Sequence, residues 1–273
     1  MLSLVEIRTS RGTMLSLPID DISDGIVLES IEGLDPVKAT LVSSSLAQMD
    51  GTQYHSSRRE SRNIKFTISL EPDYILNSVS DVRNRLYSYF IPKAFVGIRF
   101  YTSEGLVVDI FGRVESFETL LFAKEPKVDI SVMCFDPDFV ELDPIQILGD
   151  TVSDNTETLI EYSGTVETGI RLVLNVDRTL TEFTVYQRAP DDSIRSLDFS
   201  AALVAGDVVE INTVVGNKRA TLTRSNVLTS VLYGVSPQSN WIQLEQGDNN
   251  LRVYAVGAPI PHELYYTPRH GGL

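Results

Sequence analysis

The stretch Ser239-Asn-Trp-Ile-Gln-Leu-Glu-Gln-Gly-Asp-Asn-Asn-Leu251 indicates how the second half of the chain folds. A polar segment from Gly247 to Asn250 lies between two apolar runs, and glycine and asparagine accept the positive φ angles that a tight turn needs. This pattern predicts a chain reversal at the edge of a β-sandwich. The stretch carries no nucleophile paired with a base and no set of metal ligands, so it favours a structural role over a catalytic one.

Short apolar runs continue through this half, from Leu159 to Tyr266, with turn residues about every eight to twelve positions. Val231 to Val235 is one of these expected strands. Residues 146–158 are polar with few aromatic side chains, and we expect them to form an exposed connection. The pattern predicts a jelly-roll type of β-sandwich without helices.

The first half also consists mainly of expected strands. Leu2 to Arg8 and Met14 to Pro18 flank a turn at Gly12, which predicts a hairpin. Leu106 to Phe122 predicts two bent strands.

One segment of the first half has helical periodicity. Its apolar residues lie three and four positions apart, which places them on one stripe of a helix: Val79, Val82, Leu86 and Phe90. Ser78 or Ser80 can cap the start, and Asp81 suits the positive end of the helix dipole. We expect a single helix, ended before Pro92, packed on the sheet.

A polar segment, Gln48 to Asn63, separates the expected strands Val37 to Leu46 and Ile64 to Leu70. It is too long for a tight turn and predicts an extended hairpin arm with a mobile or partner-ordered tip. The arm carries a local excess of positive charge: Arg58, Arg59, Arg62 and Lys65. Three interpretations stay open: a solvated loop, an arm whose arginines bind carboxylates of a neighbouring copy, and a nucleic-acid contact.

Length and charge limit the remaining possibilities. A chain of 273 residues favours two domains, and Asp143-Pro144 places the boundary between residues 1–145 and 146–273. The net charge is −14, with 14 basic and 22 acidic residues in the first part and 9 and 15 in the second. Because phosphate binding needs clustered lysine and arginine, we expect no tight binding to DNA, and an acidic surface repels passing polyanions.

The sequence contains no recognisable catalytic, cofactor or metal site. Motifs of serine hydrolases, phosphate loops and dinucleotide folds are absent from it. The single Cys134 lies in an alternating run and is expected to be a buried thiol. Asp136 and Asp138 flank Pro137 and are expected to be solvated carboxylates at a strand end, since a calcium loop needs more oxygens. We therefore expect no enzyme, no cofactor and no metal.

The single Trp241 has two interpretations. Its neighbours alternate between polar and apolar, so the ring can pack in the core of the sandwich, which is the common environment of tryptophan. An exposed Trp241 would instead stack on a sugar ring.

With these residues in view, the chain resembles the distal tail proteins of long-tailed, non-contractile bacteriophages over almost its whole length. The resemblance rests on the order and spacing of short motifs, most of which are turns: Gly33-Leu34-Asp35-Pro36, Asp50-Gly51, Arg62-Asn63-Ile64-Lys65-Phe66, Asp136-Pro137-Asp138-Phe139, Tyr162-Ser-Gly164-Thr-Val-Glu167-Thr, Gly206-Asp207-Val-Val-Glu-Ile-Asn212, Trp241 to Leu251 and Arg269-His-Gly-Gly-Leu273.

The resemblance implies a fold that is mainly β, with a tail-tube-like sheet, one helix and a long hairpin arm in residues 1–145. Residues 146–273 would form a galectin-like peripheral sandwich. It implies a ring, usually a homohexamer, at the tail tip, which joins the tail tube protein to the hub or tip protein and to receptor-binding or side-fibre proteins. DNA would pass through its channel without specific binding.

The resemblance also implies a location in the virion, after assembly in the host cytoplasm and without membrane insertion. Three alternatives stay open beside a tail-tip connector. One is a tail-tube subunit, although such subunits typically have a single domain. The others are a carbohydrate-binding protein that uses Trp241 and a polysaccharide-cleaving enzyme, for which no residue gives support.

Overall fold

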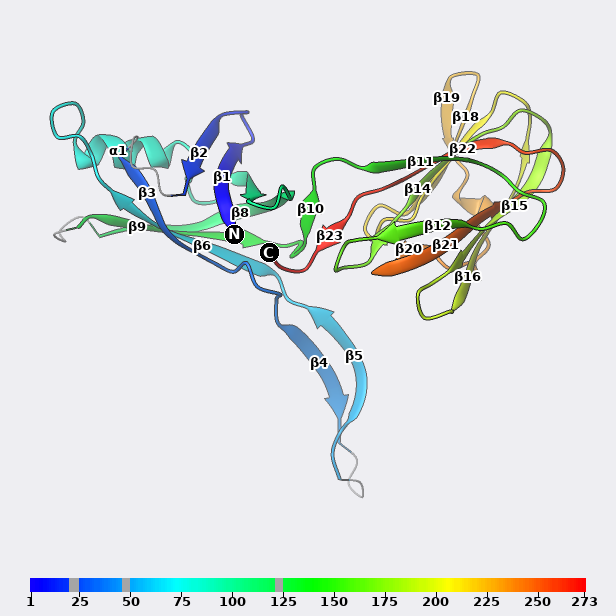
Figure 1. The fold of residues 1–273 in the computed structure, drawn as a ribbon, viewed down its shortest axis with the longest axis horizontal. Coiled ribbons are helices and arrows are strands. Elements are labelled where there is room, and N and C mark those ends of the chain that lie inside the picture. The colour runs from blue at the N-terminus through cyan, green and yellow to red at the C-terminus, as the bar shows by residue number, and fades with distance from the viewer. Residues whose placement is uncertain (20–24, 46–49, 121–124) are drawn as a thin grey trace. The chain divides into compact units, whose positions relative to one another are not determined.

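The computed structural model of the chain describes residues 1–19, 25–45, 50–120 and 125–273. The fold is mainly β with one α-helix, as expected (Figure 1). The described chain divides into two compact units, Met1–Leu142 with Gly271–Leu273, and Asp143–His270. The last three residues return to the first unit, where the Leu273 backbone N–H donates to the Leu34 carbonyl over 3.0 Å.

An antiparallel sheet forms the first unit, with the strand order β2-β1-β7-β8-β9-β6-β3 and β10 beside β8. The bounds of its strands are β1 (Leu2–Thr9), β2 (Met14–Pro18), β3 (Ile26–Glu32), β6 (Arg62–Leu70), β7 (Phe95–Thr102), β8 (Val107–Leu120), β9 (Lys127–Cys134) and β10 (Phe139–Glu141). The β1–β2 hairpin has the expected turn, in which Gly12 adopts a φ of 81°.

Alternating side chains build the core of this unit. In β6 the side chains of Ile64, Phe66 and Ile68 are fully buried, whereas Lys65 between them is exposed. The helix α1 (Val79–Tyr87) adds its apolar stripe to the same core. Its start is the expected one, because Ser78 and Asp81 form a reciprocal capping box.

The arm is a separate two-stranded ribbon of β4 (Ala39–Ser44) and β5 (Gln53–Arg59). In Figure 1 it leaves the sheet of the first unit between β3 and β6, so the predicted long hairpin arm is present. All side chains of β5 are exposed. An isolated two-stranded ribbon is at best marginally stable in water, so the arm has the character of a segment that needs a partner.

The second unit is a β-sandwich. Its sheets have the orders β11-β22-β14-β17-β18-β19 and β12-β21-β15-β16, with the short pair β13-β20 beside them, and side chains of both large sheets enter one core. The bounds are β11 (Ile145–Asp150), β12 (Thr158–Tyr162), β13 (Thr168–Gly169), β14 (Arg171–Asn175), β15 (Leu180–Arg188), β16 (Ile194–Leu203), β17 (Val208–Asn212), β18 (Arg219–Arg224), β19 (Val227–Ser230), η1 (Leu232–Gly234), β20 (Gln243–Leu244), β21 (Gly247–Tyr254), β22 (Pro261–Tyr266) and β23 (Arg269–His270).

Three expected elements differ from the structure. Val231 to Val235 forms the 3-10 turn η1 instead of a strand, since a short apolar run does not distinguish a buried turn from a strand. Residues 146–158 are not simply a connection, because β11 pairs along β22 as an edge strand with an exposed Leu148. Of the expected range Leu106 to Phe122, the described residues 106–120 contain the strand β8, with an irregular register at Val114 to Ser116 in place of a break, and residues 121 and 122 lie outside the described part of the chain.

The stretch around Trp241 also folds differently in detail. Gly247 has the expected positive φ of 103°, but it already begins β21. The reversal is closed by Asn249, whose fully buried side-chain amide donates to the Glu245 carbonyl over 2.7 Å and to the Gly247 carbonyl over 3.0 Å. No helix in the described part of the chain is long and apolar enough to cross a membrane.

Candidate assembly surfaces

The four cationic residues predicted for the arm have separate environments. Arg58 is exposed on β5 and Lys65 is exposed on β6, within the sheet. Arg59 and Arg62 are fixed at the base of the arm by contacts inside the first unit. The structure therefore does not bring the four together as one gripping surface.

Arg62 is a buried structural residue, which corrects its expected place on the arm surface. Its side chain is 1% exposed, and its guanidinium lies 4.3 Å from the ring centroid of Phe139. The guanidinium donates to four backbone carbonyls at 2.5–2.7 Å, those of Gly33, Asp35, Pro137 and Gly271. Burial lowers the pKa of Arg62 below its ordinary value, and the nearby Cys134 and Asp138 oppose this shift.

Arg59 ties the base of the arm to the end of the sheet. Its two terminal nitrogens bind the two carboxylate oxygens of Asp138 in a forked ion pair, in which Nη2 lies 3.0 Å from Oδ2. Asp138 is 4% exposed, so the expectation of a solvated carboxylate is wrong for this residue. No pattern in the sequence links the two, because they lie 79 positions apart.

The exposed surface of the arm combines positive charge with apolar side chains. Neither β4 nor β5 contains an acidic residue, although the chain as a whole has a net charge of −14. Leu41, Val42 and Tyr54 are 67%, 49% and 61% exposed, and Arg58 is an exposed cation of the same ribbon. Such a surface fits a partner with apolar and acidic side chains.

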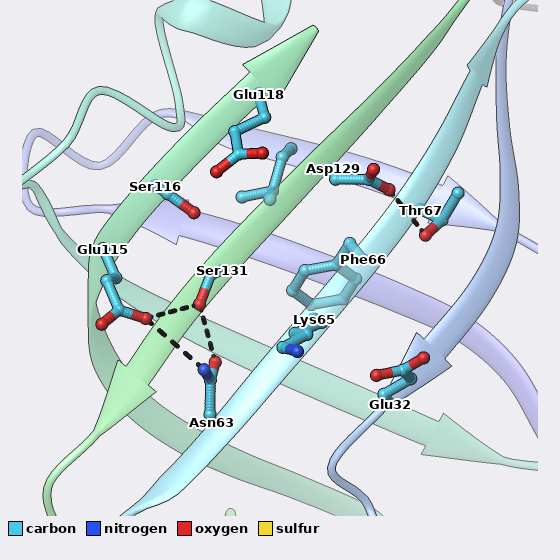
Figure 2. Close-up of a pocket in the computed structure, with 11 residues that line it drawn as sticks. Glu32, Asn63, Lys65, Phe66, Thr67, Glu115, Ser116, Glu118, Asp129 and Ser131 are labelled. Carbon is cyan, nitrogen blue, oxygen red and sulfur yellow. Dashed lines mark hydrogen bonds between the residues drawn. The ribbon is translucent and has the colours of Figure 1, made fainter. Parts of the chain in front are cut away.

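A carboxylate-rich groove of about 550 Å³ lies on the face of the sheet that is turned away from the core. Figure 2 shows Glu115, Ser131 and Asn63 grouped at one end, where the Ser131 hydroxyl lies 2.8 Å from both Glu115 Oε2 and Asn63 Oδ1. Thr67 donates to Asp129 over 2.8 Å. The groove is lined by Glu32, Asn63, Lys65, Phe66, Thr67, Glu115, Ser116, Glu118, Asp129, Ile130 and Ser131.

The groove has a clear excess of negative charge. Four carboxylates from β3, β8 and β9 face one cation, Lys65. Sequence reasoning missed this site, although polar residues at alternate positions of β6 and β9 were a visible signal for one solvated face. Among the described residues, no three histidine, cysteine or acidic side chains are arranged to hold a metal ion. The groove can repel a polyanion, in agreement with the charge of the whole chain.

Trp241 is half-buried against the core of the second unit. The adjacent Ile242 and Leu244 are fully buried, and the Lys218 ammonium lies 5.5 Å from the centroid of the indole ring. Sugar stacking by Trp241 stays a prediction. Elsewhere in this unit, burial lowers the pKa of His262.

The second unit has a sequence relative of known type. Residues 163–270 match the family described as the siphovirus-type tail component, C-terminal domain. This match covers most of the second unit, Asp143–His270. The expected resemblance to siphophage distal tail proteins is thereby confirmed, and so is the expected location in the virion.

The whole chain has the fold of solved phage proteins. The SPP1 Dit (gp 19.1) protein, described as a paradigm of the hub adsorption apparatus in phages that infect Gram-positive hosts, has 15% identity and a TM-score of 0.68, with 97% of this chain and 98% of that chain covered. A chain of the phage P2 baseplate in its activated conformation with Ca has 12% identity, a TM-score of 0.50 and full coverage of both chains. No curated protein matches in sequence. The predicted fold class, with its two β-rich parts, is confirmed.

Proposed function

We propose that this chain is the ring-forming structural protein at the distal end of a long non-contractile phage tail. One observation carries the proposal: the two units together have the fold of SPP1 Dit over 97% of the chain, and the second unit matches the tail-component family. In this ring, six copies would connect the tail tube to the hub.

Residues 1–145 would form the ring and residues 146–273 would lie at its periphery. The arm would bind the neighbouring copy through Arg58, Leu41, Val42 and Tyr54, all of which are exposed. Arg59 and Arg62 would hold the arm at its base. A permanent ring needs large interfaces, on the order of 2,000 Å² or more, and an arm that crosses a neighbour adds to that area.

The carboxylate-rich groove supports a channel that DNA passes without binding. In this proposal the outward face of the sheet, with Glu32, Glu115, Glu118 and Asp129, contributes to the wall of the channel. The tail tube protein and the hub protein would bind the two faces of the ring, and receptor-binding or side-fibre proteins would attach to its periphery. The role is structural and needs no catalytic residue.

The mass of the purified protein in solution tests this proposal. Light scattering and electron microscopy should show a ring of about six copies, each of 30.3 kDa. A protein that remains monomeric at high concentration, with its own tail tube and hub proteins present, would contradict the proposal.

A further inference from the structure

The turn between β6 and α1 exposes three consecutive large apolar side chains. Tyr74, Ile75 and Leu76 are 78%, 92% and 76% exposed. Single exposed apolar residues are common on protein surfaces, but a contiguous exposed group marks a contact site. We call these three residues the apolar turn.

The apolar turn is held in place by its own hydrogen bonds. The backbone N–H groups of Leu76 and Asn77 donate to the Asp73 carbonyl over 2.9 and 2.7 Å, and the Ile75 N–H donates to Asp73 Oδ1 over 3.0 Å. Immediately after it, the capping box of Ser78 begins α1. The three side chains are therefore presented on a preorganised support, which lowers the entropy cost of binding.

A second exposed apolar surface lies on the outward face of β7 and β8. The rings of Phe95 and Phe111 are 44% and 51% exposed, their planes differ by 1° and their centroids are 6.0 Å apart. Gly97 makes room for this arrangement, because a Cβ atom there would lie 3.1 Å from the Phe111 ring. We call Phe95 and Phe111 the aromatic platform.

The borders of the two surfaces carry opposite charges. Glu71 and Asp73 flank the apolar turn, and both are exposed. Lys93 and Arg113 border the aromatic platform; the Arg113 guanidinium lies 6.0 Å from the Phe95 centroid and donates to the Lys93 carbonyl over 3.0 Å. In the described part of the chain, no hydrogen bond, ion pair or ring contact joins the turn to the platform.

We propose that the apolar turn of one copy docks on the aromatic platform of the next copy. The inference rests on the proposed ring. A closed ring with rotational symmetry uses two different, complementary surfaces on every subunit, and one unit of this chain carries such a pair. The apolar turn and the aromatic platform are complementary, because both have apolar side chains at the centre and their borders carry opposite charges. Because five side chains cover less than a standard interface, the contact acts together with the arm.

Two variants that each lose one surface test the proposal. Ile75→Lys places a cation opposite Lys93 and Arg113, and Phe111→Ser removes half of the platform. Each variant alone should need a roughly 10-fold or higher protein concentration to assemble than the original chain does. Both substituted residues are exposed, so circular dichroism should show folded subunits with the original melting temperature.

Mixing the variants distinguishes a head-to-tail contact from a general loss of assembly. The intact platform of the Ile75→Lys chain can bind the intact turn of the Phe111→Ser chain. The substituted turn of the first chain and the substituted platform of the second cannot bind each other, so the assembly stops at two copies. An equimolar mixture should therefore give a dimer, at twice 30.3 kDa, at concentrations where each variant alone is monomeric. Light scattering measures both results.

Cross-linking gives an answer that does not depend on weakened assembly. A chain with Ile75→Cys and Phe111→Cys, in a Cys134→Ser background, should form a ladder of covalent multimers with a short thiol-reactive cross-linker. Either cysteine alone should give no ladder.

Two results would overturn the contact between copies. One is unchanged ring formation by Ile75→Lys. The other is that the variant rings assemble normally and lose only their binding to the tail tube or hub protein. A monomeric original chain would instead contradict the proposed function itself, so the two failures are distinguishable.

Discussion

Arg62 keeps its charge inside the first unit because four carbonyl oxygens accept its N–H groups and the Phe139 ring covers its plane. In the sequence, only the sign of its charge groups Arg62 with Arg58. The sign of a charge does not indicate where the side chain points. The carbonyls that bind Arg62 come from segments as far as 209 positions away, and no local pattern reports them.

We expect Arg62→Met to lower the free energy of unfolding of the first unit by about 3–5 kcal/mol. The substitution leaves buried carbonyls without donors, and each such loss costs about 1–3 kcal/mol. Urea unfolding measures the change. Arg58→Met is the matched control and should change stability by less than about 0.5 kcal/mol, because Arg58 is exposed. Equal stabilities of the two variants would contradict the structural role of Arg62.

Cys134 should be chemically inert in the folded protein. It is fully buried, as expected from the sequence, and burial raises the pKa of its thiol from 9.0 to about 12. The folded state therefore keeps the thiol protonated at pH 8, while the unfolded state exposes an ordinary thiol. A thiol reagent such as DTNB should react only after denaturant is added. Rapid reaction without denaturant would contradict this burial.

Trp241→Ala separates the two interpretations of this residue. Since Trp241 is half-buried against the core, we expect the substitution to lower the stability of the second unit by about 2 kcal/mol. Thermal unfolding and glycan binding should be measured together. Loss of glycan binding with unchanged stability would favour a sugar site over core packing.

At the scale of elements, local signals in the sequence predicted most of the fold. The capping box of α1 and the β1–β2 turn are formed by neighbouring residues, so they were visible. Edge strand β11 was missed, because it pairs with only one strand and exposes Leu148. The groove carboxylates were missed as a site for a related reason: sheet pairing brings together strands that are distant in the sequence.

The arm supports a prediction for assembly. The double variant Leu41→Ser with Arg58→Glu should weaken ring formation and leave the melting temperature of the subunit unchanged, because both residues are exposed. Analytical ultracentrifugation over a range of concentrations measures assembly. Arg188→Glu, in the second unit, is the control and should assemble normally. Normal assembly of the arm variant would remove the arm from the interface.

At the scale of the whole molecule, the charge of the groove supports a prediction about DNA. The original protein should not retard double-stranded DNA in a gel-shift experiment at about 0.15 M salt, because its net charge and its groove are negative. Rings with Glu32→Lys and Glu118→Lys should retard DNA, and the effect should weaken as salt increases. Retardation by the original protein would contradict a passive channel wall.

The return of Gly271–Leu273 to the first unit has a consequence for synthesis on the ribosome. Arg62 receives the carbonyl of Gly271 only after another 209 residues are translated, which takes about 10–40 s at typical bacterial rates. During that delay, the base of the arm lacks one of its hydrogen-bond acceptors. A nascent chain therefore carries an incompletely fixed arm until Gly271 has been translated.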